Sequence, residues 1–442
     1  MNNKPTILII IGISGDLSKR KLLPAIGQIG ANGKLPDYFK IVGVTRQSDI
    51  NLESLLQNTI NKDCLRKNTE IFQMDIEESM EYRRLQDRLN DIEKEFGSTS
   101  QYLFYFSVPP KVTESIIKLI GESDLLKHDI KLLLEKPFGT DLKSAKDLII
   151  YIDKYFKKEQ VYRIDHYLAK EAAQNIIIFR DSNSLFKKTW NKNFIKKIEI
   201  SVSEEIGIEG RVKFYEQTGA LRDLIQSHLL QLLALVIMDI PENFNFKEIP
   251  HLRYKALSNL HLKSVKSTQD SAIRGQYIGY REEVNNLNSM TETFASINLE
   301  SDDPNWKDVD IKLTTGKALD KKFAEIKILY KKIKTYESNE LLINLQPNEK
   351  ISLGISIKSP GYDYPINSQY LNFSFNEKYG TIPDAYEQVL FDAIKGNFNL
   401  FVTSEEILET WRILDQLQKI WLTSVDNLIL YNKGSSINDI IG

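Results

Sequence analysis

The sequence predicts an α/β, doubly wound dinucleotide-binding domain of the Rossmann type, followed by a larger α+β domain with a mainly antiparallel sheet. Two observations predict the first domain. A continuous apolar run, Thr6 to Ile11, leads directly into a glycine-containing turn, and further short apolar runs then alternate with charged, helix-like stretches. The second domain is predicted because this alternation stops after Glu171. The change of pattern alone places the boundary at residue 165, giving parts 1–165 and 166–442.

Size and composition narrow the functional classes. The chain has 442 residues and a formal net charge of −2, so it can bury real cores and gives no reason to expect nucleic acid or an anionic membrane as partner. Its single cysteine, Cys64, cannot form an internal disulfide or a multi-cysteine metal site, so we expect a reducing compartment and no bound metal. Because we identify neither an 18-residue apolar run nor a secretory leader, we expect a cytoplasmic protein.

The first strand is expected at Thr6 to Ile11, and the turn G-I-S-G-D-L follows it at once. Gly12 can take the tight turn, and Gly15 lets the backbone approach a pyrophosphate at the positive end of the next helix. Ser18 replaces the third glycine of the usual pattern, so a plain strand-to-helix turn is the alternative. As a cofactor turn it comprises Gly12, Ile13, Ser14, Gly15, Asp16 and Leu17.

Five more strands complete a predicted parallel sheet of about six. They are expected at Lys40 to Thr45, Glu70 to Met74, Tyr102 to Ser107, Ile130 to Leu134 and Val161 to Arg163. A dinucleotide would bind outside their carboxyl ends, where the strand order reverses. The proline-containing segments Ser107 to Pro110 and Glu135 to Gly139, the latter with Lys136, are expected at that edge.

The end of the second predicted strand bears on cofactor choice. Chains that bind NAD usually carry Asp or Glu there to bond the ribose 2′-hydroxyl, whereas this chain reads Thr45-Arg46-Gln47. An arginine favours a 2′-phosphate, so NADP is the expected cofactor and NAD is possible with lower preference. The alternative is that Arg46 is an ordinary surface charge.

The second domain is expected to contain strands at Lys196 to Ser203, Glu292 to Leu299 and Lys322 to Tyr330. Before the last two lies an apolar helix, Ala220 to Met238, which carries His228. A lone histidine in such a helix is more often a satisfied core residue. With a carboxylate partner such as Asp165, a neutral imidazole would instead be a competent base near pH 7.

The segment Arg163 to Glu171 reads R-I-D-H-Y-L-A-K-E and gathers polar side chains of several kinds. If Leu168 to Glu171 open a helix, His166 and Lys170 fall on one face, where two cationic groups can converge on a phosphate, and Asp165 faces elsewhere. The alternative is a solvated helix start with ordinary charges.

Taken together, these residues resemble the glucose-6-phosphate dehydrogenase family over nearly the whole chain. No single motif would suffice, but seven in the same order are specific. They are GxSGDLxxRKLLPA at Gly12, EKPFGxDL at Glu135, RIDHYLxKE at Arg163, GRxxxYxxxGALRDxxQxHLLQ at Gly210, TETF at Thr291, GKALDKKxAEI at Gly316 and DAYExxxxD at Asp384.

The resemblance implies a hydride transfer from C1 of glucose 6-phosphate to NADP, giving the phosphorylated 1,5-lactone, by a homodimer or dimer of dimers built through the second domain's sheet. It implies that His228 is the general base and that Asp165 orients it. The remaining implied positions are His166, Tyr167, Lys170 and Lys322 at the sugar phosphate; Glu204 and Asp223 at the sugar hydroxyls; Lys136 at the reacting end, where it also contacts the cofactor; Lys317 beside the substrate; and Gly12 to Leu17, Arg46 and Asp75 at the cofactor.

The chain also departs from the family pattern. Asp308-Val309-Asp310-Ile311 stands where the family has GVPF, and Thr314 replaces an arginine, which puts the placement of Lys317 in question. Two other functions stay open at this point. One is an oxidoreductase of unphosphorylated sugars with the same dinucleotide domain and EKP motif, and the other is a degenerate cofactor sensor or scaffold.

Overall fold

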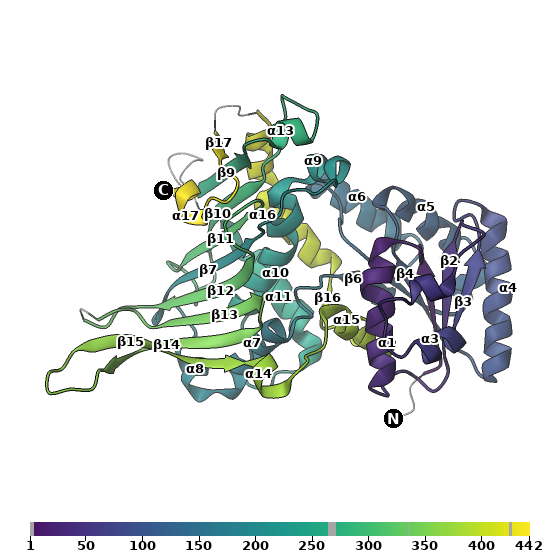
Figure 1. The fold of residues 1–442 in the computed structure, drawn as a ribbon, viewed down its shortest axis with the longest axis horizontal. Helices are drawn as coiled ribbons and strands as arrows, with labels where there is room; N and C mark the ends of the chain where they lie inside the picture. Colours follow the sequence, from purple (N-terminus) through teal and green to yellow (C-terminus); the bar gives the residue numbers. More distant parts are fainter. Residues whose placement is uncertain (1–3, 264–270, 335, 424–426) are drawn as a thin grey trace.

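The computed structural model describes residues 4–263, 271–334, 336–423 and 427–442, which form two sheets in the two halves of the molecule (Figure 1). The first sheet contains β1 (Thr6–Ile11), β2 (Phe39–Thr45), β3 (Thr69–Gln73), β4 (Gln101–Phe106), β5 (Asp129–Leu134), β6 (Val161–Ile164) and β16 (Phe401–Val402). Their order is β16-β6-β5-β4-β1-β2-β3. Strands β1 to β6 pair in parallel and the order reverses between β1 and β4, which confirms the predicted doubly wound sheet.

Helices of the first half follow from apolar spacing and end signals. The longest, α4, buries Tyr82, Leu85, Leu89 and Ile92 at intervals of three and four residues, and Gly97 ends it in the left-handed conformation. The helical elements here are η1 (Ser18–Leu22), α1 (Leu23–Ala31), α2 (Leu52–Leu55), α3 (Lys62–Asn68), α4 (Ser79–Phe96), α5 (Pro110–Gly121), η2 (Asp124–Lys127), α6 (Leu142–Asp153) and η3 (Lys158–Gln160).

The second sheet has ten strands, which are β7 (Ile195–Ser203), β8 (Leu260–Leu262), β9 (Ala272–Tyr277), β10 (Phe294–Ser301), β11 (Asp310–Gly316), β12 (Phe323–Tyr330), β13 (Glu340–Gln346), β14 (Lys350–Lys358), β15 (Ile366–Ser374) and β17 (Leu428–Tyr431). Their order is β15-β14-β13-β12-β7-β11-β10-β9-β17, with β8 paired to β10. All pairs are antiparallel except β7 with β11 and β9 with β17. The predicted mainly antiparallel sheet is therefore confirmed.

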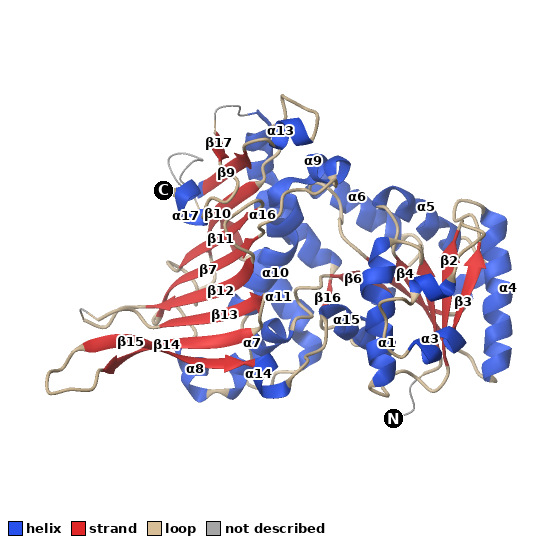
Figure 2. Cartoon of the chain, viewed as in Figure 1, coloured by secondary structure: helices blue, strands red, loops and turns tan. Residues whose placement is uncertain are grey.

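Helices pack on the face of the second sheet that looks toward the first half (Figure 2). Their apolar side chains and those of the sheet form one large core. The helical elements of the second half are α7 (Glu171–Ser182), α8 (Ser184–Thr189), α9 (Val212–Ala220), η4 (Leu221–Leu229), α10 (Leu230–Ile237), η5 (Phe246–Glu248), α11 (Ile249–Ser258), α13 (Tyr280–Glu283), α14 (Phe375–Tyr379), α15 (Ala385–Lys395), α16 (Ser404–Thr423) and α17 (Ile437–Ile441).

The helical stretch Val212–Ile237 differs from expectation in its apolar character. It is 26 residues long, and its most apolar window has a mean hydropathy of 1.4, so by length and composition it could cross a membrane, although the sequence was expected to contain no such run. In the folded chain, 83% of its most apolar window is buried. It is the core helix of the second half, bent where Gly219 takes a positive φ of 66°.

The segment after β6 corrects one prediction. The expected helix start at Leu168 is wrong, because residues 165–170 form turns and α7 begins at Glu171, with Lys170 as its N-cap residue. His166 and Lys170 therefore do not share a helix face. Turns at the carboxyl edge of the sheet, not a helical repeat, position these side chains.

The last part of the chain returns to the first sheet. Strand β16 pairs antiparallel with β6, and the ring of Phe401 lies 4.7 Å from that of Tyr162. Helix α15 packs against α1, and Gln101 Nε2 donates a hydrogen bond of 2.7 Å to the carbonyl of Ile394. The boundary predicted at residue 165 falls at the end of β6, but residues from the far end of the sequence complete the first half.

One buried ion pair fixes this return segment. Arg253 of α11 and Glu406 of α16 are both fully buried, and Arg253 Nε donates to Glu406 Oε1 at 2.7 Å. The same guanidinium donates to the carbonyls of Asn399 and Phe401, which flank the start of β16. The arginine thus joins two helices and the added strand.

We expect Arg253→Ala to lower the free energy of unfolding by about 3–5 kcal/mol, because it leaves the Glu406 carboxylate buried and unpaired. Urea denaturation of the purified protein measures this loss. The matched control is Arg66→Ala, which removes an exposed arginine paired with Glu53 and should cost about 1 kcal/mol or less. Equal losses for the two variants would contradict the structural role of Arg253.

Candidate active site

The glycine turn after β1 has the geometry expected of a phosphate-binding turn. Gly12 has a φ of +90°, and a Cβ there would lie 2.4 Å from the carbonyl oxygen of Ser107. The buried Ser18 donates a hydrogen bond from Oγ to the Gly12 carbonyl (3.1 Å), and the same Oγ lies 3.0 Å from Ser107 Oγ, from which it can accept. Ser18 therefore ties this turn to the end of β4, so the position usually occupied by a third glycine is filled by a side chain with two partners.

The other expected cofactor residues surround the carboxyl ends of β2 and β3. Arg46 directly follows β2, and Asp75 lies two residues beyond β3; both are exposed. Ser14 Oγ lies 3.4 Å from Thr45 Oγ1, which brings the glycine turn to the end of β2. Asp16 is highly exposed and pairs with Arg20. The glycine turn, the start of the following helix and the exposed Arg46 thus lie along one edge of the sheet, and they fit a dinucleotide.

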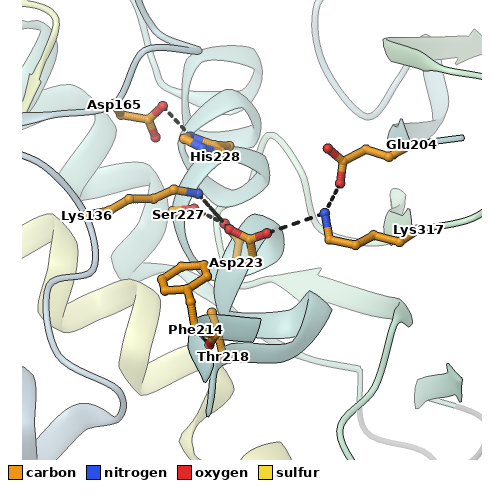
Figure 3. Close-up of polar contacts among 9 residues, drawn as sticks. All are labelled: Lys136, Asp165, Glu204, Phe214, Thr218, Asp223, Ser227, His228 and Lys317. Carbon is orange, nitrogen blue, oxygen red and sulfur yellow. Dashed lines mark hydrogen bonds and ion pairs between the residues drawn. The ribbon is translucent and has the colours of Figure 1, made fainter. Parts of the chain in front are cut away.

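A histidine–aspartate pair lies at the centre of the site (Figure 3). His228 Nδ1 lies 2.6 Å from Asp165 Oδ1, and both side chains are buried, with 1% and 3% of the residue surface exposed. The backbone N–H of Tyr167 also donates to Asp165 Oδ1, at 3.0 Å. With Nδ1–H donating to the carboxylate, Nε2 has a free lone pair, and Nε2 has no hydrogen-bond partner within the described part of the chain.

Burial and charge set the protonation states of this pair. Burial lowers the pKa of His228 below 6.5, although Asp165 opposes the shift, so the imidazole is neutral at pH 7. Burial alone would raise the pKa of Asp165, but His228 and the hydrogen bond outweigh it and lower that pKa to about 2. The pair is therefore a carboxylate holding a neutral base.

Lys136, Asp223, Lys317 and Glu204 form a chain of alternating charges beside this pair (Figure 3). Lys136 Nζ donates to Asp223 Oδ1 at 3.0 Å, and Lys317 Nζ contacts Glu204 and lies 3.9 Å from Asp223 Oδ2. Lys317 is buried despite the departures at Asp308 to Thr314, so the doubt about its placement is removed. Burial alone would raise the pKa of Asp223, but Lys136 and Lys317 outweigh it and lower that pKa to about 2, so this carboxylate is ionised.

Asp223 and His228 are five residues apart in the sequence, and they lie on one face of the helix because η4 is a π-helix. In an α-helix such residues point about 140° apart, whereas i→i+5 hydrogen bonds bring them toward one face. This local widening positions the base and the paired carboxylate together, and nothing in the apolar pattern of the sequence indicates it.

The expected phosphate residues gather at one end of the same site. Lys170 Nζ lies 3.9 Å from Glu349 Oε1 and 5.9 Å from the centre of the Tyr167 ring, which stacks on His228. Burial lowers the pKa of Lys170, and the positive charges of Lys21 and of the exposed Lys322 add to this effect, whereas Glu349 and Asp384 oppose it. Burial also places the pKa of His166 well below 6.5, which corrects the expectation of a cationic His166.

The structure adds residues that received no role from sequence reasoning. Tyr386 of α15 lies parallel to the His166 ring at 5.8 Å and is next to Glu135, which also accepts a 2.5 Å hydrogen bond from Tyr105. Asp384 pairs with Lys21 at 2.9 Å. Of these, Tyr386 and Asp384 lie in the DAYE motif, whose position in the fold the sequence does not indicate. Within the described residues, no cluster of His, Cys, Asp and Glu has the geometry of a metal site.

Two family models match the chain end to end. That of the glucose-6-phosphate dehydrogenase NAD-binding domain covers residues 9–175, and that of the C-terminal domain covers residues 177–439. Glucose-6-phosphate 1-dehydrogenase of Chlamydia muridarum is 34% identical over 94% of this chain and 90% of its own length. The same enzyme of Buchnera aphidicola from Schizaphis graminum is 34% identical over 98% of this chain and 95% of its own length.

Solved structures agree with these matches over the whole fold. A glucose-6-phosphate dehydrogenase in complex with glucose 6-phosphate superposes with a TM-score of 0.90 at 28% identity, covering 99% of this chain and 96% of its own. The glucose-6-phosphate 1-dehydrogenase of Mycobacterium avium gives 0.84 at 28% identity, covering 98% and 95%. With both domains, the sequence relatives and the fold in agreement, the chain belongs to the glucose-6-phosphate dehydrogenase family.

Proposed function

We propose that the protein is a glucose-6-phosphate 1-dehydrogenase, which oxidises C1 of glucose 6-phosphate and gives 6-phosphoglucono-1,5-lactone. The observation that carries the proposal is the neutral, buried His228 held by Asp165 between a dinucleotide turn and a cluster of lysines. A base, a hydride path and a phosphate anchor are what this oxidation needs. Family membership supports the same reaction.

In this proposal His228 Nε2 accepts the proton of the C1 hydroxyl. Asp165 keeps the imidazole in the Nδ1–H tautomer and stabilises the imidazolium that forms, and such a base typically contributes about 10² to 10⁴ in rate. The bound nicotinamide dinucleotide supplies the acceptor for the C1 hydride. Asp223 and Glu204 accept hydrogen bonds from sugar hydroxyls, with Lys136 paired to Asp223 and Lys317 paired to Glu204.

Sugar recognition is assigned to the other end of the site. Lys170 and Lys322 hold the 6-phosphate, with His166 as a neutral donor and Tyr167 as a hydroxyl, so that phosphate binding aligns C1 with the base. This set of lysines argues against an oxidoreductase of unphosphorylated sugars. The intact His228–Asp165 geometry argues against a sensor without catalytic activity.

The family's dinucleotide-binding domain means that the cofactor is a nicotinamide dinucleotide, and we assign NADP as the preferred one. The glycine turn holds the pyrophosphate, Arg46 pairs with the 2′-phosphate, and Asp75 lies on the adenine side. The proposal rests on an exposed arginine at the end of β2, where chains that prefer NAD place a carboxylate.

We also propose a cytoplasmic homodimer, or a dimer of dimers, built through the second sheet. Support comes from the arrangement of its layers, since the helices cover the face toward the first half (Figure 2). The opposite face presents polar side chains such as Glu199, Lys312 and Lys327 along adjacent strands, and these suit a polar subunit contact.

The variant His228→Asn should cut kcat by roughly 10² or more while glucose 6-phosphate binding stays within a few fold, because the base acts in the transition state. The variant Asp165→Asn should lose less kcat, since Asp165 orients the base and does not take the proton itself.

The activity of the wild type should fall below pH 6.5 as the His228 imidazole becomes protonated. In Asp165→Asn this fall should move to lower pH, because the variant lacks the negative charge that favours the imidazolium. Steady-state kinetics from pH 5 to 8 on the wild type, His228→Asn and Asp165→Asn measure these effects, and the change His251→Asn at an exposed histidine is the control. Near-normal turnover in His228→Asn would refute the assignment.

The change Lys170→Ala should raise KM for glucose 6-phosphate by about tenfold or more, because a charge-assisted contact is worth roughly 1.5–3 kcal/mol. Slow oxidation of free glucose, which has no phosphate, should change little. The measurement is kcat/KM for both sugars, with Lys146→Ala as an exposed-lysine control. If both sugars lose the same factor, Lys170 has a structural role.

Replacing Arg46 by alanine should weaken the binding of NADP by about tenfold or more and the binding of NAD far less, because only NADP carries the 2′-phosphate. Fluorescence titration with the two reduced cofactors measures the ratio. Lys111→Ala, an exposed change near the same edge, serves as control. Equal losses for the two cofactors would place Arg46 elsewhere.

A further inference from the structure

A cavity is lined by β6, by the segment before β16 and by the first turn of α16. Figure 1 shows β6 and β16 on the side of the first half that faces the second half. The cavity has a volume of about 390 Å³. None of its lining residues belongs to the proposed sugar or cofactor sites. The residues that matter below are Lys158, Tyr162, Arg163, Phe398, Ser404 and Glu405.

Arg163 is the unusual feature of this cavity. Only 2% of the residue surface is exposed, and Nη2 has no hydrogen-bond partner among the described residues. Two other buried arginines, Arg180 and Arg253, differ in that both of their Nη atoms donate to backbone carbonyls, and Arg253 also binds Glu406. A buried guanidinium with an unused donor facing a cavity calls for an anionic acceptor.

The charges on the lining balance, since Lys158 and Arg163 are positive and Glu159 and Glu405 are negative, but Arg163 alone of these four is buried. Lys158 and Glu405 pair with each other at the rim. Burial lowers the pKa of Arg163 to about 10, opposed by the more distant Asp153 and by Glu405, so the guanidinium is still charged at pH 7. Glu159 also lies on the lining and is exposed. With these carboxylates nearby, a single negative charge can be accommodated more readily than two.

A second unused donor faces the same space. Ser404 is 5% exposed, its Oγ has no partner among the described residues, and it is the first residue of the 20-residue helix α16. The helix does not need this hydroxyl as a cap, because Thr403 Oγ1 accepts from the Glu406 backbone at 3.2 Å. The hydroxyl and the positive end of the helix therefore add to the attraction for an anion.

The remaining walls are apolar. The rings of Tyr162 and Phe398 stand edge to face with centroids 5.1 Å apart, and both line the cavity. A planar guanidinium binds a carboxylate through two parallel N–H groups, and the aromatic edges favour a hydrocarbon body behind it. We propose that this cavity binds a small monocarboxylate with an apolar or aromatic body, its carboxylate on Arg163 and Ser404 and its body against Tyr162 and Phe398.

The test uses sodium benzoate as probe in isothermal titration calorimetry with the full-length protein. Glucose 6-phosphate is saturating, cofactor is omitted and ionic strength is held constant with chloride, so the sugar site is occupied. The wild type should bind benzoate saturably at one site. Arg163→Met should weaken binding by about tenfold or more, and Arg163→Lys should fall between, because an ammonium keeps the charge and loses the paired donors.

A second variant covers the case in which Arg163→Met fails to fold. Ser404→Leu keeps Arg163 and fills the cavity at a residue that does not cap helix α16. This variant should also weaken the binding of benzoate by about tenfold or more. Lys146→Ala should bind as the wild type does. Absence of saturable binding, or binding that neither variant changes, overturns the proposal. Binding of inorganic phosphate but not benzoate, with the same dependence on Arg163, overturns the carboxylate assignment.

Discussion

The 2.6 Å contact between His228 and Asp165 joins the two halves of the molecule at the point where the proposed chemistry occurs. Asp165 directly follows the last parallel strand of the first sheet, and His228 lies on the helix that forms the core of the second half. Both groups are buried, so neither tolerates loss of its partner. The relative placement of the cofactor edge and the sugar end is therefore set by one charge-assisted hydrogen bond and by the packing that holds its two carriers.

The charged groups around that contact form ion pairs, and each ion pair links two different structural elements. Lys136 extends from the end of β5 to Asp223 on η4, and Lys317 extends from the end of β11 to Glu204 after β7. Lys136 and Lys317 together lower the pKa of Asp223, which burial would otherwise raise, so this carboxylate is ionised in a buried site. An arrangement of this kind offers a substrate fixed acceptors that need no reorganisation when the sugar binds.

The sequence predicted what depends on local pattern and failed where distant segments meet. The six parallel strands were predicted to within one residue because buried runs end at glycine, proline or charged turns. The helix start at Leu168 was wrong, since the Asp165 carboxylate, which is held by His228, accepts from the Tyr167 backbone N–H and keeps the segment in turns. Tyr386 and Glu349 reach the site from far along the chain, and the π-helix that aligns Asp223 with His228 has no periodic signal. The pairing of His228 with Asp165 was inferred because one kind of chemistry required it.

The short strand β16 has a consequence for how the protein is made. The edge formed by β6, including the ring of Tyr162, is covered by residues near 400, more than 200 positions later in the chain. During synthesis from the N-terminus, the nucleotide-binding half emerges first but lacks this cover until almost the whole polypeptide has left the ribosome. Its last strand remains an open edge through that interval, a template for wrong pairing with other chains. The first half of the molecule is thus completed only near the end of synthesis, when β16 has emerged and can pair with β6.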